Sequence, residues 1–255
     1  MVLYTVNGRV ATITLNRPEK RNAFNPALVT ALTDAFTEAA DDERVKVIIL
    51  KAAGSIFSAG ADLEYLQQLQ TNTHEENVKD SEQLKNLFTT IYYLPKVVIA
   101  QVEGHAIAGG CGLATVCDLV FAVPEARFGY TETRLGFVPA IVSCFLLHKT
   151  SETVAKKILL SGDLFSAAEA LACNLISYVT KAEEIDHTVY AFAQELCEKA
   201  SGNSLMVTKQ LIGQTNRPAL ENSLNLAVQI NARVRESEDF KKGIAAFLNR
   251  EKIKW

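Results

Sequence analysis

Two glycine-bearing turns, each preceded by a run of apolar residues, constrain the fold of this chain more than any other feature. The run 45–50 leads to the turn Phe57–Leu63, and the run 97–102 leads to the turn Gly104–Ala114. Because glycine has no Cβ, the backbone at such turns can bend sharply and approach a ligand closely. Two backbone N–H groups that converge on one oxygen form an oxyanion hole. The two turns therefore indicate an enzyme that stabilises a negatively charged oxygen, such as that of an enolate.

Strands and helices alternate over the first half of the chain. We predict strands over residues 3–15 (a hairpin around Asn7–Gly8), 45–52, 97–102 and 118–122, and helices over 26–40, 81–93 and 110–117. Asn25 is suited to cap the first of these helices, and Pro26 suits its first position. The polar stretch 67–82 is predicted to be partly helical and mobile. The alternation is typical of a layered α/β core.

From about residue 151 the pattern becomes mostly helical. The predicted helices span 154–160, 166–173, 182–200, 204–213 and 219–236. A chain of 255 residues is long enough for one large domain with a buried core. We therefore treat the helical part as a C-terminal region within one functional unit.

Composition and charge exclude several kinds of partner. The chain is 48% hydrophobic and 22% charged, as soluble globular proteins are. Its net charge of −3, without a basic cluster, argues against a nucleic-acid partner. No apolar run approaches the roughly 20 residues that span a bilayer, and the first residues lack the pattern of a signal peptide. We expect a cytoplasmic protein without a membrane partner.

Cysteine and histidine spacing predicts neither disulfides nor a metal site. The five cysteines are scattered and form no CxxC pair, which favours reduced, mostly buried thiols. The four histidines likewise lack metal-ligand spacing.

Five segments, in order along nearly the whole chain, resemble the crotonase, or enoyl-CoA hydratase/isomerase, superfamily. They are Asn16–Pro18 with Asn22–Asn25, Phe57–Leu63, Gly104–Cys117, Leu160–Asp163 with Ser166–Ala170, and Ala246–Trp255. The resemblance implies an α/β fold in which ββα units form a spiral core, here over residues 1–195. It also implies a helical C-terminal trimerisation region, here over residues 196–255, and assembly into homotrimers or hexamers.

The resemblance also implies which residues carry the chemistry. The backbone N–H groups of Ala61 and Gly109 would form the oxyanion hole, and Glu132 matches the catalytic glutamate of the family. Gly109 stands where a helix is predicted to begin, so its free N–H and the helix dipole suit an anion. A carboxyl beside an apolar acyl pocket has a raised pKa, which suits proton exchange at carbon.

Coenzyme A contacts are carried over from the resemblance in the same way. The implied binding residues are Lys20 and Arg21 for phosphates, Ala23, Ala59 and Ala61 for adenine and pantetheine, Asp62 and Leu63 along the turn, and Phe247 and Arg250 toward the CoA of a neighbouring subunit. The resemblance implies neither a metal nor a redox cofactor, since CoA is part of the substrate.

The chain departs from the family at Gly112, which we also place in the substrate site. Hydratases with two glutamates carry the second one at this position, whereas here Glu132 would have to serve alone. A single glutamate is what a Δ3-Δ2 enoyl-CoA isomerase needs, because that reaction moves one proton from C2 to C4. A third possibility is an acyl-CoA-binding or scaffold protein with vestigial chemistry.

A second local resemblance favours a hydratase of branched substrates. Residues 132–143 and 108–113 resemble a subgroup that includes bacterial 3-methylglutaconyl-CoA hydratases of leucine degradation. The subgroup also includes dehydratases of hydroxymethylglutaryl thioesters on carrier proteins. A distal carboxylate on the substrate needs a cation, for which Arg134, His148 and Lys149 are candidates. We therefore predict a hydratase of 3-methylglutaconyl-CoA or a similar branched enoyl thioester, with the isomerase and the dehydratase as alternatives.

Overall fold

A six-stranded sheet forms the centre of the computed structural model, which describes residues 1–255. The strand order is β1-β2-β3-β5-β7-β10, with bounds β1 Val2–Asn7, β2 Val10–Leu15, β3 Val47–Ala52, β5 Val97–Val102, β7 Leu119–Ala122 and β10 Tyr178–Val179. The β1–β2 hairpin is antiparallel, and every other pair in this sheet is parallel. The central strands are almost fully buried, as a parallel sheet covered on both faces requires.

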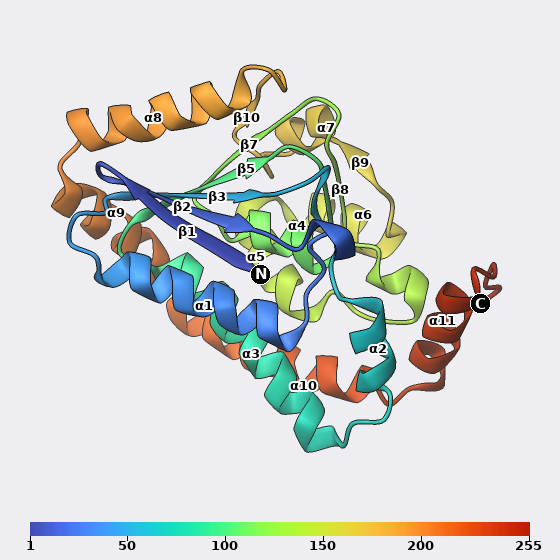
Figure 1. The fold of residues 1–255 in the computed structure, drawn as a ribbon. Helices are drawn as coiled ribbons and strands as arrows, with labels where there is room; N and C mark the ends of the chain where they lie inside the picture. The colour runs from blue at the N-terminus through green and yellow to red at the C-terminus, as the bar shows by residue number, and fades with distance from the viewer.

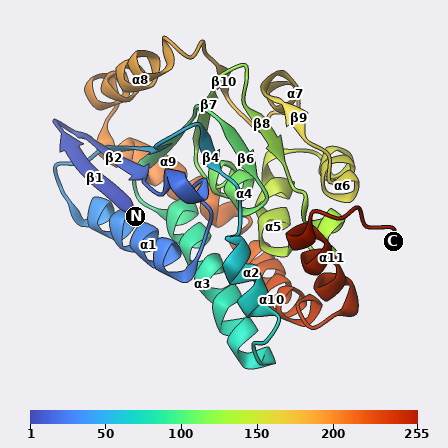
Figure 2. The ribbon, with the colours of Figure 1, turned by 45° about the vertical axis from the view of Figure 1, so that its right-hand side comes forward.

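A second, shorter sheet is built from strands that directly follow the long ones. Its order is β4-β6-β8-β9, with bounds β4 Ile56–Ser58, β6 His105–Ile107, β8 Arg127–Gly129 and β9 Phe165–Ser166. Thus β4 follows β3, β6 follows β5 and β8 follows β7, each pair leading to helical structure. This repetition produces the ββα units of the predicted fold. Figure 2 shows β4, β6 and β8 next to one another.

Helices cover both faces of the long sheet (Figure 1). On one side lie α1 (Pro26–Asp41), α3 (His74–Tyr93) and α10 (Arg217–Val234), and on the other lies α8 (Ile185–Lys199). The remaining helices are α2 Leu63–Leu69, α4 Gly109–Thr115, α5 Ala140–Lys149, α6 Glu152–Ser161, α7 Ala167–Ala172, α9 Gly202–Thr215 and α11 Glu238–Asn249, with short 3-10 helices η1 Pro18–Lys20 and η2 Glu132–Leu135. None of these helices is both long enough and apolar enough to cross a bilayer.

Several elements confirm the sequence-based predictions. The hairpin turns at Gly8, whose φ is +57°. The Asn25 side chain accepts the Leu28 N–H at 2.9 Å and caps α1, with Pro26 at the first position. β5 has the predicted bounds, and α3 ends at Tyr93, just before Pro95. Local chemistry decides these features, which is why they are visible in the sequence.

Other elements differ from the predictions. α3 begins at His74 and not at residue 81, because Thr73 and Glu76 form a capping box that starts the helix earlier. α5 was not predicted, since its sequence is apolar on nearly every face and shows no helical periodicity. The predicted boundary between residues 195 and 196 falls within α8, and a separate assembly role for the C-terminal region stays a prediction.

Candidate active site

The first glycine turn is held against Phe24 by a parallel bridge. The Phe24 N–H donates to the Gly60 carbonyl at 2.6 Å, and the Asp62 N–H donates to the Phe24 carbonyl at 2.8 Å. Successive N–H groups of an extended segment point to opposite sides. The N–H of Ala61 is therefore directed away from Phe24 and takes no part in this bridge.

The second turn carries the most strained backbone of the site. Ala108 has φ 51° and ψ −125°, a conformation that residues with a side chain rarely adopt. Its N–H donates to the Gly129 carbonyl of β8 at 2.7 Å. Gly109 follows as the first residue of α4, so its N–H has no acceptor within the helix. A strained residue next to a backbone N–H without an acceptor, as at Ala108 and Gly109, is typical of a functional turn.

The backbones of the two turns are in contact. A Cβ built on Gly60 would lie 2.9 Å from the Cβ of Ala108 and 3.6 Å from the Gly109 nitrogen. A Cβ on Gly110 would lie 2.6 Å from the Cβ of Ser58. Glycine is thus required at these positions for the turns to approach one another.

Glu132 reaches the same edge of the short sheet. Ala61, Gly109 and Glu132 each follow the end of a strand, β4, β6 and β8 respectively, by two or three residues. These strands are parallel neighbours, so their carboxyl ends meet at one edge. The structure therefore brings together the three groups for which catalytic roles were predicted.

The Glu132 carboxyl is shielded from solvent. The residue is 8% exposed, and its Oε2 has no hydrogen-bond partner. Burial raises the pKa of this carboxyl to about 7. Burial is the main reason that the pKa values of Cys111 and Tyr130 are raised, and the charge of Glu132 adds to both shifts, so its carboxyl lies near Cys111 in the first turn of α4. At neutral pH such a carboxyl can both take up and release a proton.

The space beside Gly112 is filled by a side chain of α5. A Cβ on Gly112 would overlap Cγ1 of Val142, and it would lie 3.1 Å from Cβ of Val142 and 3.2 Å from the Phe88 ring. A glutamate at position 112 would require these side chains to move. The prediction that Gly112 binds substrate gains no support, because the glycine is buried and faces Val142.

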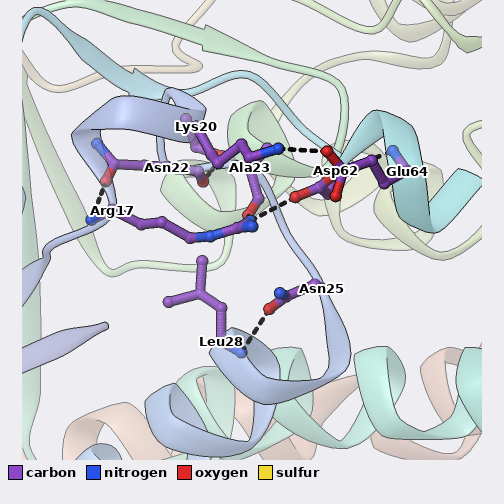
Figure 3. Close-up of polar contacts among 9 residues, drawn as sticks. Arg17, Lys20, Asn22, Ala23, Asn25, Leu28, Asp62 and Glu64 are labelled. Atoms are coloured by element: carbon purple, nitrogen blue, oxygen red, sulfur yellow. Dashed lines mark hydrogen bonds and ion pairs between the residues drawn. The ribbon is translucent and has the colours of Figure 1, made fainter.

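A buried ion pair holds the first turn in place (Figure 3). The Asp62 Oδ2 lies 2.6 Å from Nη1 of Arg17, and Oδ1 accepts the Glu64 N–H at 3.0 Å, which caps α2. The same Arg17 nitrogen donates to the Ala23 carbonyl at 3.1 Å. Asp62 was predicted to line the substrate site, but its carboxyl is occupied by these structural contacts. Arg17 is therefore a positioning residue, a role that was not predicted from the sequence.

Asn22 supports the same turn and was also missed as a structural centre. It is fully buried with φ +52°, a left-handed conformation that asparagine tolerates. Its Nδ2 donates to the carbonyls of Ala53 and Ile56 at 2.9 and 2.8 Å. Its own carbonyl accepts the Ser58 hydroxyl at 2.9 Å. An asparagine in the turn 16–22 was the available sequence signal, because asparagine tolerates a left-handed conformation.

The predicted CoA-binding residues lie in two places. Near the first turn, Lys20 pairs with Glu64 at 2.5 Å, and the Arg21 carbonyl accepts the Ala59 N–H at 3.0 Å (Figure 3 shows the Lys20 pair). Ala23 lies beside these residues, and Leu63 opens α2. Phe247 and Arg250 lie at the exposed end of α11, where Arg250 ends the helix with φ 57°. Their role toward a neighbouring subunit stays a prediction.

Two of the three cations suggested for a distal carboxylate have other partners, and the third, His148, lines a separate cavity. Arg134 forms an ion pair with Asp163 at the surface. Lys149 donates to the carbonyls of Cys117 and Asp118 at 2.7 and 3.3 Å, at the far end of α5 from Ala140. His148 lies beside Lys149, with its ring 6.5 Å from that of Tyr92. None of the three is a free cation beside Glu132.

The cavity beside His148 and Lys149 is separate from this site. Its volume is about 460 Å³, and its lining includes Val97 and Leu119, the first residues of β5 and β7. Ligands of parallel α/β sheets bind at the carboxyl ends of the strands. This cavity lies at the opposite ends, so we assign the chemistry to the glycine turns.

Comparisons with known proteins agree with this geometry. The model of the family described as enoyl-CoA hydratase/isomerase matches residues 5–255. A Thermus thermophilus protein provisionally named an enoyl-CoA hydratase is 40% identical over 95% of this chain and 96% of its own length. The 2,3-dehydroadipyl-CoA hydratase of Escherichia coli is 31% identical over 95% of this chain and 93% of its own. The crystal structure of an enoyl-CoA hydratase from Mycobacterium avium has a TM-score of 0.88 at 30% identity, covering 98% of this chain and 97% of that one.

Proposed function

The chain belongs to the enoyl-CoA hydratase/isomerase family, and we propose that it hydrates an α,β-unsaturated acyl-CoA thioester, namely 3-methylglutaconyl-CoA or a similarly branched analogue. The observation that carries this proposal is that the Glu132 carboxyl is buried without an ion-pair partner. Two acidic side chains of the protein are buried, Asp62 and Glu132. Asp62 is neutralised by Arg17, whereas Glu132 has no ion-pair partner and an unused oxygen.

In the proposed reaction, the N–H groups of Ala61 and Gly109 donate to the thioester carbonyl oxygen. The Glu132 carboxylate removes a proton from water while the water oxygen bonds to C3. The electron pair of the C2–C3 double bond moves toward the thioester and leaves an enolate oxygen at the two amides. The protonated Glu132 then donates its proton to C2, which releases a 3-hydroxyacyl thioester and restores the carboxylate. Each amide lowers the activation free energy by roughly 3–4 kcal/mol.

The raised pKa of Glu132 suits both proton transfers. With a pKa of about 7, the carboxyl is a stronger base than an ordinary glutamate and remains able to return the proton. The reaction needs no metal or redox cofactor, since the two amides and one carboxyl supply every step.

The branched acyl group is supported by the segment 132–143, which resembles hydratases of 3-methylglutaconyl-CoA. The similarity to a hydratase of 2,3-dehydroadipyl-CoA supports only a carboxylate at the far end of the acyl chain, because the adipyl chain is unbranched. No cation beside Glu132 contributes to this support, because Arg134 and Lys149 contact other groups and His148 lines the separate cavity.

A substrate panel in water enriched in oxygen-18 tests the proposal. We expect 3-methylglutaconyl-CoA to gain one labelled oxygen, detected by mass spectrometry of the product. Glu132→Gln should abolish turnover and leave acyl-CoA binding, measured by calorimetry, within a factor of three. Full activity of this variant would exclude the proposed role of Glu132.

The second candidate function is a Δ3-Δ2 enoyl-CoA isomerase. It is favoured by the contact between Gly112 and Val142, which leaves Glu132 as the single carboxyl of the site. A 3-enoyl-CoA would then be converted to the conjugated 2-enoyl thioester, followed by ultraviolet absorbance, without uptake of labelled oxygen. A related candidate is dehydration of a hydroxymethylglutaryl thioester on a carrier protein, which replacing CoA by a carrier-bound substrate distinguishes.

We also propose assembly into homotrimers or hexamers. Large apolar side chains are exposed on two C-terminal helices, namely Val207, Leu211 and Ile212 on α9 and Leu226 and Ile230 on α10. Val207 and Leu211, like Leu226 and Ile230, are four positions apart and share one face of their helix, and exposed apolar faces are typical of protein interfaces. Light scattering of the purified protein decides the point, and a monomer at micromolar concentration would contradict it.

A further inference from the structure

The backbone of α11 rests directly on the 3-10 helix that carries Glu132. A Cβ built on Gly243 of α11 would overlap the carbonyl group of Leu135, the last residue of η2. A Cβ on Gly136 would in turn overlap the carbonyl of Asp239, at the start of α11. Gly136 has φ +66° and ends η2, so glycine is favoured there for its conformation as well. The two glycines therefore allow a backbone-to-backbone contact that no other residue permits.

The same helix also contacts the element that follows the first oxyanion turn. Leu66 and Leu69 of α2 pack with Phe240 and Ile244 of α11 in a buried cluster that is separate from the main core. Phe137, just after η2, joins this α2–α11 cluster, and its ring lies 5.1 Å from that of Phe240. Figures 1 and 2 both show α11 beside α2, near the C-terminus.

Helix α11 thus connects the two halves of the candidate site. On one side it holds η2, whose first residue is Glu132. On the other side it holds α2, which begins two residues after Ala61. Because the α2–α11 cluster is separate from the main core, it adds apolar contacts of its own between these two elements.

We propose that Gly243 is a positioning residue, which lets α11 hold the Glu132 turn at the correct distance from the oxyanion turn and shields the carboxyl from bulk water. This inference rests on the proposed role of Glu132. Its physical basis is that an added Cβ meets a backbone carbonyl, which cannot rotate away as a side chain can. Insertion of a methyl group must therefore move α11 or η2 as a whole.

Gly243→Ala is the first test. A displacement of about 1 Å at reacting groups can lower a rate by about 100-fold, so we expect kcat to fall about 10- to 100-fold with KM changed less than threefold. The acidic limb of the pH–rate profile should move down from about pH 7, because water would reach the carboxyl.

Gly202→Ala is the matched control. Gly202 also lies in a helix, but a Cβ there would be 3.6 Å from the Lys46 side chain, an ordinary contact. We expect wild-type kcat and pH profile for this variant. Phe240→Leu is the second test, since it loosens the α2–α11 cluster without forcing a new atom into the contact. The pH profile of Phe240→Leu should move in the same direction as that of Gly243→Ala. This variant therefore tests the inference even if Gly243→Ala does not fold.

Carbon-13 NMR titration of the Glu132 carboxyl, assigned with Glu132→Gln, separates this inference from the proposed function. A lower Glu132 pKa in Gly243→Ala or Phe240→Leu supports the positioning role even if no enoyl thioester is turned over. An unchanged Glu132 pKa together with wild-type kcat in both folded variants would overturn it. A protein inactive on every substrate, with a lowered pKa in the variants, would overturn only the proposed reaction.

Discussion

The burial of Glu132 should make the stability of this protein depend on pH in a defined direction. The folded-state pKa of about 7 lies above the ordinary value of 4.5. Above pH 7 the unfolded chain carries this carboxylate in water, whereas the folded chain must hold it shielded from solvent. Since one pKa unit corresponds to about 1.4 kcal/mol, ionised Glu132 destabilises the fold by about 3 kcal/mol.

The sign follows from proton binding. Between pH 4.5 and pH 7 the folded state binds more protons at this site than the unfolded state, so the contribution to stability falls as pH rises through this window. Below pH 4.5 both states are protonated and the penalty disappears. Glu132→Gln removes the titration. Relative to wild type, this variant should therefore gain about 2–3 kcal/mol of unfolding free energy between pH 5 and pH 8.

Chemical denaturation at pH 5 and at pH 8 measures this gain. The protomer concentration is kept constant, because the proposed assembly would contribute to stability. Glu198→Gln, on the exposed face of α8, is the matched control and should show no such pH-dependent gain. If Glu132→Gln and wild type differ by the same amount at pH 5 and pH 8, the carboxyl is not desolvated and the reasoning fails.

Further predictions concern the surrounding contacts. Gly112→Ala should lower the free energy of unfolding by about 1–3 kcal/mol through overpacking, and Val142→Ala in the same chain should restore part of it, as measured by denaturation. Arg17→Met should cost about 3–5 kcal/mol, because it leaves the Asp62 carboxylate buried without its partner; a loss below 1 kcal/mol would contradict this. Arg134→Gln should leave kcat/KM for the branched substrate within twofold, since its partner is the exposed Asp163; a tenfold rise in KM would return Arg134 to the substrate site.

Features decided by neighbouring residues were predictable from the sequence. The Asn7–Gly8 hairpin, the Asn25 cap with Pro26 and the long strands all depend on local chemistry. The three-residue strands β4, β6 and β8 were not predicted from apolar patterns, because so short a segment has no readable alternation. The family resemblance supplied the ββα arrangement that these strands create.

Contacts between distant residues lay beyond the sequence analysis. Val142 fills the space beside Gly112 from a helix thirty positions later in the numbering, which only the packing of α5 on α4 reveals. Arg134 pairs with Asp163, and Lys149 donates to backbone carbonyls, so their charges are used within the fold. The predicted burial of the Glu132 carboxyl, by contrast, agrees with its low exposure and raised pKa.

The arrangement of β4, β6 and β8 has an evolutionary consequence. Their hydrogen-bonded ladder spaces the positions that follow them at intervals of about 4.8 Å per strand. Phe88 of α3 and Val142 of α5, which lie beside Gly112, are not part of that ladder. Substitutions at such positions can therefore reshape the space near the site while the reacting groups keep their separation. Proteins with this fold can therefore change their preferred thioester through substitutions around the site, while the catalytic step stays the same.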